Sequence, residues 1–192
     1  MRKIYDWMMR MSAGPNAPYA LALVSFLESS IFPIPPDVML VPMVLADRTK
    51  AWRHATVATI ASVLGGLAGY AIGYFLFDII GRPILDVYGY GGKFDVVSAW
   101  FRDWGVWILI GKGWTPFPFK VLTILAGAAQ MNLASFAIAS IVARAMRFFL
   151  VAGLLYYFGE PIRDFIEKRL TLVTTAFVVA LIGGFVTLKY LV

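Results

Sequence analysis

Long apolar stretches separated by short polar segments make up most of this sequence, at residues 19–46, 55–77, 105–129, 133–158 and 172–191. A helix needs about 20 apolar residues to cross the hydrocarbon core of a bilayer. The stretches 55–77, 133–158 and 172–191 reach that length without a break, so we expect about three full transmembrane helices. The preceding residues 2–11 combine basic side chains with apolar ones at helical spacing, which predicts an N-terminal interfacial helix.

Prolines interrupt the other two apolar stretches. The breaks contain Pro33, Pro35, Pro36, Pro116 and Pro118. Proline removes a backbone donor and restricts the residue before it, so a helix cannot continue through these segments. The flanks of the first break, at about 10–14 residues each, are too short to span a bilayer. We therefore predict two re-entrant helical hairpins, with a single kinked span over residues 19–46 as the alternative.

The two proline breaks belong to an internal repeat. When Pro33-x-Pro35 is superposed on Pro116-x-Pro118, Asp37 falls on Lys120, and each broken stretch is followed by one full span. A hairpin returns to the side that it entered, so each unit crosses the membrane an odd number of times. The sequence thus predicts a single all-α integral membrane domain over residues 1–192 with an inverted-topology repeat. Its parts are a first repeat at 12–86, a second repeat at 87–164 and a C-terminal transmembrane helix at 172–191.

A row of small residues follows one face of the stretch 55–77. Gly65, Gly69 and Gly73 recur every four residues, in the same row as Ala61. Such a row lets the backbone of a neighbouring helix approach closely. We expect this face to be a packing seam rather than a chemical site.

The composition narrows the classes of function. Hydrophobic residues make up 60% of the chain, cysteine is absent, and His54 is the one histidine. Disulfides, thiolate metal sites and histidine clusters are therefore excluded, and we expect no metal and no cofactor. Many basic residues lie at 2–10, 48–53 and 163–169, on one side of the predicted topology. The positive-inside rule then puts the N-terminus in the cytoplasm, and contact with lipid rather than nucleic acid accounts for the charge.

Six ionisable residues lie inside the apolar stretches: Glu28, Asp37, Lys112, Lys120, Arg144 and Arg147. A charge within the membrane costs a few kcal/mol or more and marks a functional site by default. The first hairpin supplies both acids and the second supplies both lysines. The span that follows adds the two arginines, about one helical turn apart and hence on one face. We predict that these six residues bind a substrate or an ion.

Bases outnumber acids in this group by about two positive charges, which matches a phosphate group. Pro36 and Pro118 suit the first helical position of the second hairpin arms, which puts positive helix ends inside the membrane. Lys120 at such an end calls for an anion. The alternatives are that the charges pair with one another, or that a lysine such as Lys112 extends to the interface. Glu28 and Asp37 can also load and release protons. Burial in a low-dielectric cavity favours the protonated carboxyl, whereas nearby bases and positive helix ends favour the ionised one.

Two motifs carry a resemblance to a known family. Glu28 followed by Phe32-Pro-Ile-Pro-Pro-Asp37, and Gly113-Trp-Thr-Pro-Phe-Pro-Phe-Lys120 with Ala126-Gly127, resemble the DedA family of bacterial membrane proteins, which carries the VTT domain, and within it the YqaA-like subgroup. By motif position, Glu28 and Asp37 match the family's two essential membrane acids. The family's arginine-containing run is replaced here by Lys112 and Lys120, which keeps the positive charge but gives up bidentate recognition.

The resemblance implies a role in undecaprenyl phosphate recycling, phospholipid scrambling and proton-dependent membrane homeostasis in the bacterial inner membrane. We expect a lipid transporter, a flippase or a scramblase, that moves an anionic phosphate headgroup, with proton coupling as an option and a homodimer left open. A proton-coupled transporter of small ions or solutes is the first alternative. A lipid-phosphate phosphatase is the second, but the sequence offers no Ser-His-Asp arrangement and no metal cluster, so we expect no catalytic residues and no enzyme.

Overall fold

The computed structural model describes residues 14, 16–30, 35–83, 91–113 and 118–168, and within these ranges every regular element is a helix. The N-terminal helix predicted at 2–11, the C-terminal helix predicted at 172–191, and Pro33 and Pro116 lie outside the described residues. The helical elements are α2 (Ala17–Ser30), α3 (Asp37–Ala46), η1 (Arg48–Lys50), α4 (Ala51–Leu76), η2 (Phe77–Gly81), α6 (Gly91–Gly113), α7 (Phe119–Ala128) and α8 (Leu133–Lys168).

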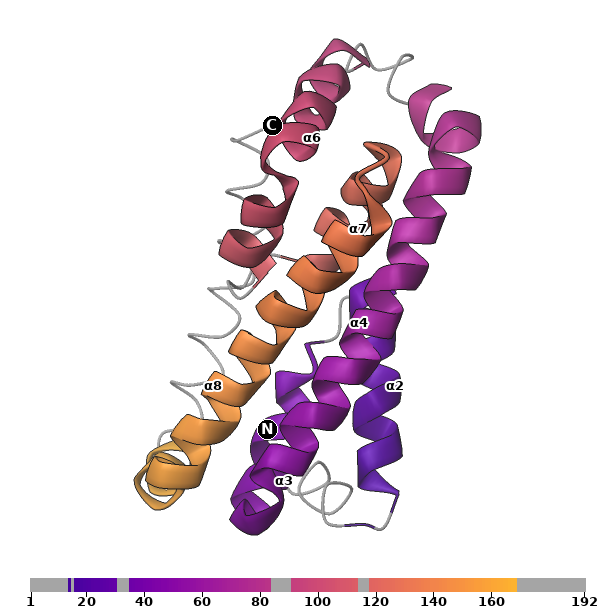
Figure 1. Ribbon diagram of the computed structural model, residues 1–192. Coiled ribbons are helices and arrows are strands. Elements are labelled where there is room, and N and C mark those ends of the chain that lie inside the picture. Colours follow the sequence, from indigo (N-terminus) through magenta and orange to yellow (C-terminus); the bar gives the residue numbers. More distant parts are fainter. Residues whose placement is uncertain (1–13, 15, 31–34, 84–90, 114–117, 169–192) are drawn as a thin grey trace.

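Two long apolar helices, α4 and α8, form the frame of the molecule and run antiparallel to each other (Figure 1). The segments Arg48–Ile79 and Leu133–Gly159 are long and apolar enough to cross a membrane. These segments confirm that the stretches 55–77 and 133–158 form long apolar helices, as the sequence predicts. The helical geometry of α8 is interrupted at Phe158, and Pro161 follows within the same element. A proline removes the hydrogen bond that would keep this turn straight, which explains why the regular span ends where the sequence predicts.

The proline breaks lie between α2 and α3 and between α6 and α7. α3 and α7 have 10 residues each and α2 has 14. Pro36 and Pro118 are the N-cap residues of α3 and α7, so each helix begins one residue after the proline that the sequence predicts as its first helical residue. The shift is small and leaves the positive ends of both helices next to the breaks.

The first arm of the second broken stretch is longer than its apolar pattern predicts. α6 has 23 residues and begins at Gly91, whereas the apolar stretch starts at residue 105. Trp100, Trp104 and Trp107 are exposed along one face of α6, while Phe101 and Leu109 are buried on the other. The charged residues around position 103 therefore belong to an amphipathic helix, whose polar positions hide it from a search for continuous apolar residues.

The helices on either side of each break pack on different long helices. α2 packs on α4 and α6 packs on α8, so each first arm contacts the long helix of its own half. α7 packs on α4 and α3 packs on α8, so each second arm contacts the long helix of the other half. In Figure 1, α2 and α3 lie toward the end where α4 begins, and α6 and α7 lie toward the end where α8 begins.

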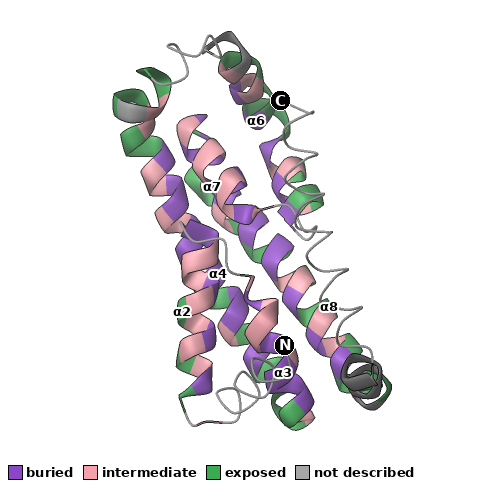
Figure 2. Cartoon of the chain, turned by 180° about the vertical axis from the view of Figure 1, so that it is seen from behind, coloured by how far each residue is buried: buried purple, intermediate pink, exposed green. Residues whose placement is uncertain are grey.

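Two hydrophobic clusters result from this arrangement. The first joins α2, α3, the start of α4 and the later part of α8, and it includes Met43 and Phe148. The second joins α6, α7, the later part of α4 and the start of α8, and it includes Phe119 and Phe136. Outside these clusters, the long helices expose large apolar side chains such as Ile60, Phe75 and Ile138. Figure 2 shows exposed positions, in green, along the helices. Exposed apolar surface of this extent is typical of helices that face lipid.

The glycine row of α4 is a packing seam, as the sequence predicts. A Cβ at Gly65 would overlap the backbone of Phe26 in α2, and a Cβ at Gly73 would overlap the backbone of Ile124 in α7. Gly69, between them, lies against Thr123 and the carbonyl group of Ser29. Small residues are required here because the neighbouring backbones sit directly on α4. The seam brings the ends of α2 and α7 together beside the middle of α4.

Candidate functional site

Arg144 is the centre of the candidate site. It lies in the middle of the apolar part of α8 and is 1% exposed, which makes it one of the largest fully buried side chains. Its guanidinium group lies 4.4 Å from the ring centroid of Phe119 and 4.9 Å from that of Phe148. These rings come from the two different hydrophobic clusters. Arg144 therefore sits at the junction of the clusters, where cation–π contacts offset part of the cost of burying it.

Three hydrogen bonds hold the guanidinium group of Arg144. Nη2 donates to Oε2 of Glu28 over 2.5 Å, and Nε donates to Oγ of Ser62 over 2.6 Å. Nη1 donates to the carbonyl oxygen of Gly113, the last residue of α6, over 3.4 Å. These partners come from α2, α4 and α6, so one side chain of α8 links three other helices. A charged hydrogen bond in surroundings of low dielectric is strong, and a lone charge there is costly.

A second ion pair lies one helical turn further along α8. Nη2 of Arg147 donates to Oδ2 of Asp37 over 2.5 Å, and the two side chains are 19% and 21% exposed. Asp37 is the first residue of α3, where the positive end of the helix dipole favours a carboxylate. Its other oxygen, Oδ1, is buried and accepts no hydrogen bond from any residue that the structure describes.

The structure brings four of the six predicted site residues together as two pairs. Each pair joins an acid of the first broken stretch to an arginine of α8, which is the pairing left open as an alternative in the sequence. The two lysines are placed differently. Lys112 is exposed in the last turn of α6, and Lys120 is half-buried in the first turn of α7. Whether they contact a substrate stays a prediction.

Sequence reasoning missed the buried hydroxyl groups of the site. Oγ of Ser29 donates to Oε2 of Glu28 over 3.1 Å and lies 2.6 Å from Oγ of Ser62. Both serines are buried, and Ser62 lies on the face of α4 that carries the glycine seam. A signal was present, because a hydroxyl within a row of glycines is a polar group placed where another helix must approach. Serine is too common in membrane helices for that signal to stand out.

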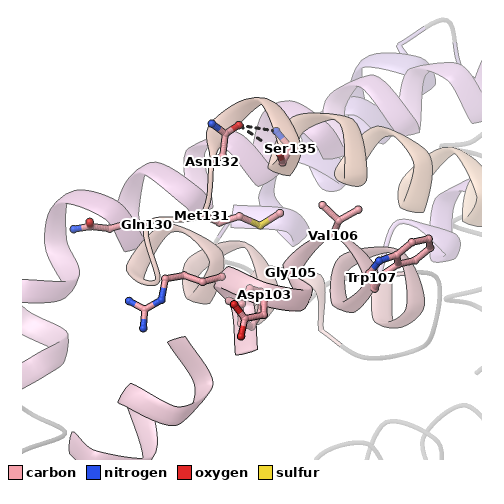
Figure 3. A pocket seen from close by; sticks show the side chains of 10 residues that line it. Asp103, Gly105, Val106, Trp107, Gln130, Met131, Asn132 and Ser135 are labelled. Carbon is pink, nitrogen blue, oxygen red and sulfur yellow. Dashed lines mark hydrogen bonds between the residues drawn. The ribbon is translucent and has the colours of Figure 1, made fainter. Parts of the chain in front are cut away.

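The described residues also line an open pocket of about 270 Å³ at the far end of the molecule, between α6 and the turn from α7 to α8 (Figure 3). Its walls include Arg102, Asp103, Trp107 and Asn132, and Oδ1 of Asn132 accepts a hydrogen bond from the backbone of Ser135. None of the six predicted residues lines it. Because it carries one base and one acid, its lining has no net charge to select an anion, and we do not assign the function to it.

Two long apolar helices, and ion pairs that join one of them, α8, to α2 and α3, are typical of an all-helical membrane protein. In the part of the chain that the structure describes, no three histidine, aspartate or glutamate side chains gather in a way that would hold a metal ion. The profile of the VTT domain matches residues 34–157. The chain belongs to the VTT-domain family, also called the DedA family, which is a family of transporter-like membrane proteins, and the predicted family is thereby confirmed.

Two relatives cover almost the whole length of this chain, and a third covers 70% of it. It is 38% identical to an uncharacterised protein of Haemophilus influenzae over 186 residues, which is 97% of this chain and 96% of the relative. It is 34% identical to an uncharacterised protein of Histophilus somni, over 97% of both chains. It is 25% identical to the inner membrane protein YqaA of Escherichia coli over 70% of this chain and 88% of that protein. No solved structure matches it.

Proposed function

We propose that this protein is a lipid transporter, a flippase or a scramblase, that moves a lipid with an anionic phosphate headgroup across the bacterial inner membrane. Undecaprenyl phosphate and phospholipids are the candidate lipids. The observation that carries the proposal is Arg144, a guanidinium group with 1% exposure in the middle of an apolar helix. Stability alone does not explain such a charge, because apolar packing is usually at least as stable as a buried ion pair. In a family of transporter-like membrane proteins, we therefore assign the charge to the binding of a substrate.

The charges of the site favour an anion as the cargo. Glu28 and Asp37 offset the two arginines, and Lys112 and Lys120 then add positive charge at the ends of α6 and α7 next to the second break. A phosphate headgroup is an anion with several acceptor oxygens, which suits a site with four basic side chains. The acyl or prenyl tails of the same lipid can stay in the bilayer, against the exposed apolar faces of α4 and α8.

Access to the site from both leaflets follows from a symmetric architecture. We infer that the two broken stretches are re-entrant hairpins of an inverted-topology repeat. The packing of the second arms supports this, because each second arm contacts the long helix of the other repeat: α3 packs on α8 and α7 packs on α4. The placement of the short helices at opposite ends of the long ones also supports it (Figure 1). In such an architecture the breaks meet near the middle of the membrane, where a headgroup must cross.

Proton coupling is part of the proposal. The side chain of Glu28 is 14% exposed, whereas that of its partner Arg144 is 2% exposed. A proton can therefore reach the acid more easily than solvent can reach the base. Protonation of Glu28 leaves Arg144 without a counter-charge, and an uncompensated buried charge is strongly unfavourable. A phosphate headgroup relieves that cost, so binding of a proton and binding of the lipid favour each other.

Two further parts of the proposal concern placement in the cell. The relative from Escherichia coli is described as an inner membrane protein, and we propose the same location here. The basic segment 48–53, at the start of α4, supports a cytoplasmic position for that end of the helix and hence for the N-terminus.

The decisive experiment is lipid movement in vesicles that contain the purified protein. A fluorescent anionic phospholipid and a prenyl phosphate serve as probes. Arg144→Ala should lower the rate of movement by about tenfold or more, since a charged hydrogen bond is lost. Arg102→Ala, which removes an exposed arginine of α6, is the matched control and should leave the rate unchanged. Equal rates for wild type and Arg144→Ala would contradict the proposal.

The same vesicles separate the two rival functions. Release of inorganic phosphate from the prenyl phosphate would identify a lipid-phosphate phosphatase. Uptake of a small anion into the vesicles, with no movement of either lipid probe, would identify a proton-coupled solute transporter. Either result would replace the lipid transporter as the function of the site.

A further inference from the structure

The hydrogen bonds around Arg144 close into a ring of four side chains. Nη2 of Arg144 contacts Oε2 of Glu28, Ser29 contacts the same oxygen, Ser62 contacts Ser29, and Nε of Arg144 contacts Ser62. The distances along the ring run from 2.5 to 3.1 Å. The four residues come from α2, α4 and α8, so the ring spans both predicted repeats.

The direction of every hydrogen bond in the ring is fixed by chemistry. An ionised carboxylate only accepts, so the single hydroxyl hydrogen of Ser29 is donated to Glu28. Ser29 must then accept from Ser62, which leaves Ser62 able to accept from Nε of Arg144. All donors therefore point from the arginine toward the carboxylate, by a direct route and by a route through the two hydroxyls. Chains aligned in this way polarise and strengthen one another.

We propose that Ser62 is a positioning residue of the transport site, which acts through Arg144 and fixes the orientation of its guanidinium group. Because Nε is bound to Ser62, the terminal nitrogens Nη1 and Nη2 are the atoms that can bind a phosphate. Nη2 donates one hydrogen to Glu28, and Nη1 donates one to the carbonyl oxygen of Gly113. Each terminal nitrogen carries a second N–H, and guanidinium N–H groups are suitable donors to phosphate oxygens.

The ring also links this orientation to the charge of Glu28. When Glu28 takes up a proton, the direct route and the hydroxyl route lose their charged acceptor together. The groups that act on this carboxyl are Arg144 from α8, Ser29 from α2 and, through Ser29, Ser62 from α4. Arg147 with Asp37 forms the neighbouring charged pair. Without Ser62, only the direct hydrogen bond between Arg144 and Glu28 couples the protonation of Glu28 to the guanidinium group. The pH dependence of transport should therefore change.

The chain offers a matched control on the same helix. Thr59 is buried on α4, one turn before Ser62, and its Oγ1 donates to the carbonyl oxygen of Ala55 within the helix. Thr59→Ala therefore removes a buried hydroxyl of α4 that is outside the ring. Ser62→Cys gives an intermediate case, because it nearly keeps the size of the side chain and weakens the hydrogen bonds.

The first measurement needs no transport. In protein labelled with ¹⁵N-arginine and held in lipid nanodiscs, the Nε–H signal of Arg144 is assigned from its loss in Arg144→Lys. Ser62→Ala should speed the exchange of this hydrogen with water by about tenfold or more, since the acceptor is removed. Ser62→Cys should fall between, and Thr59→Ala should match wild type. An unchanged exchange rate in Ser62→Ala would overturn the positioning role.

The second measurement rests on the proposed function. The rate of movement of the fluorescent anionic phospholipid is followed against pH in vesicles. Ser62→Ala should lower the rate and shift or flatten its pH profile, whereas Thr59→Ala should keep both. A profile for Ser62→Ala with the shape of the wild-type profile would overturn the link to Glu28. If wild type itself moved no lipid, the proposed function would fail, and the exchange measurement would still decide the role of Ser62.

Discussion

Two ion pairs one helical turn apart on α8 have the same length and different surroundings. Arg144 and Glu28 meet over 2.5 Å with side chains 2% and 14% exposed, and Arg147 and Asp37 meet over 2.5 Å at about a fifth exposed. The first pair has two serines and two aromatic rings around it, while the second lies at the N-terminus of α3. The comparison teaches that distance alone does not rank ion pairs, because burial decides what the loss of one partner costs.

The inner pair should be the more costly to break. Arg144→Met leaves the largely buried carboxylate of Glu28, 14% exposed, without its counter-charge, and we expect it to lower the free energy of unfolding by about 3–5 kcal/mol. Thermal or denaturant unfolding in detergent measures the change. The double variant Arg144→Met with Glu28→Gln should regain most of that loss, since no unpaired charge remains, while lipid movement should stay low. A double variant as unstable as the single one would show that the burial of charge is not the cause.

The outer pair should be less sensitive to the same change. Arg147→Met should lower the free energy of unfolding by about 1.5–3 kcal/mol, since Asp37 keeps the favourable end of α3 and partial contact with solvent. The same unfolding assay compares the two methionine variants side by side. A loss for Arg147→Met as large as that for Arg144→Met would mean that the difference in burial has no energetic consequence.

A surface pair completes the comparison and should have the smallest effect. Asp47 lies 2.7 Å from Lys50 and also accepts hydrogen bonds from Thr49 at the start of η1. Hydrogen bonds from Lys50 and Thr49 lower the pKa of the Asp47 carboxyl from 3.8 to about 2. Because the pKa is lowered, the stabilisation is present above pH 3.8 and is lost as the pH falls toward 2.

We expect Asp47→Ala to leave the unfolding midpoint at neutral pH unchanged within error, because exposed pairs contribute little. An NMR titration of the carboxyl group checks the lowered pKa, and Lys50→Ala should raise it toward the usual value. An ordinary pKa in wild type would contradict the hydrogen bonds at this turn.

The sequence predicts the individual helices well, but it does not predict which helices and side chains contact one another. The long apolar helices, the breaks, the glycine seam and the six charges within apolar stretches are all readable from it, because proline, glycine and charge act locally on a helix. α6 was mispredicted at its start, since its charges and tryptophans alternate around an amphipathic helix. Ser29 and Ser62 were missed because a hydroxyl shows its role only when a partner from another helix reaches it.

The sequence by itself therefore determined that this chain is a helical membrane protein with proline-broken stretches and costly charges inside them. Only the tertiary structure decided which acid meets which base. Glu28 lies 116 residues from Arg144, and Asp37 lies 110 residues from Arg147. No local pattern encodes a contact over such separations. It follows from the glycine seam, which brings α2 and α7 against the middle of α4, and from the packing of α3 on α8, which brings Asp37 to Arg147.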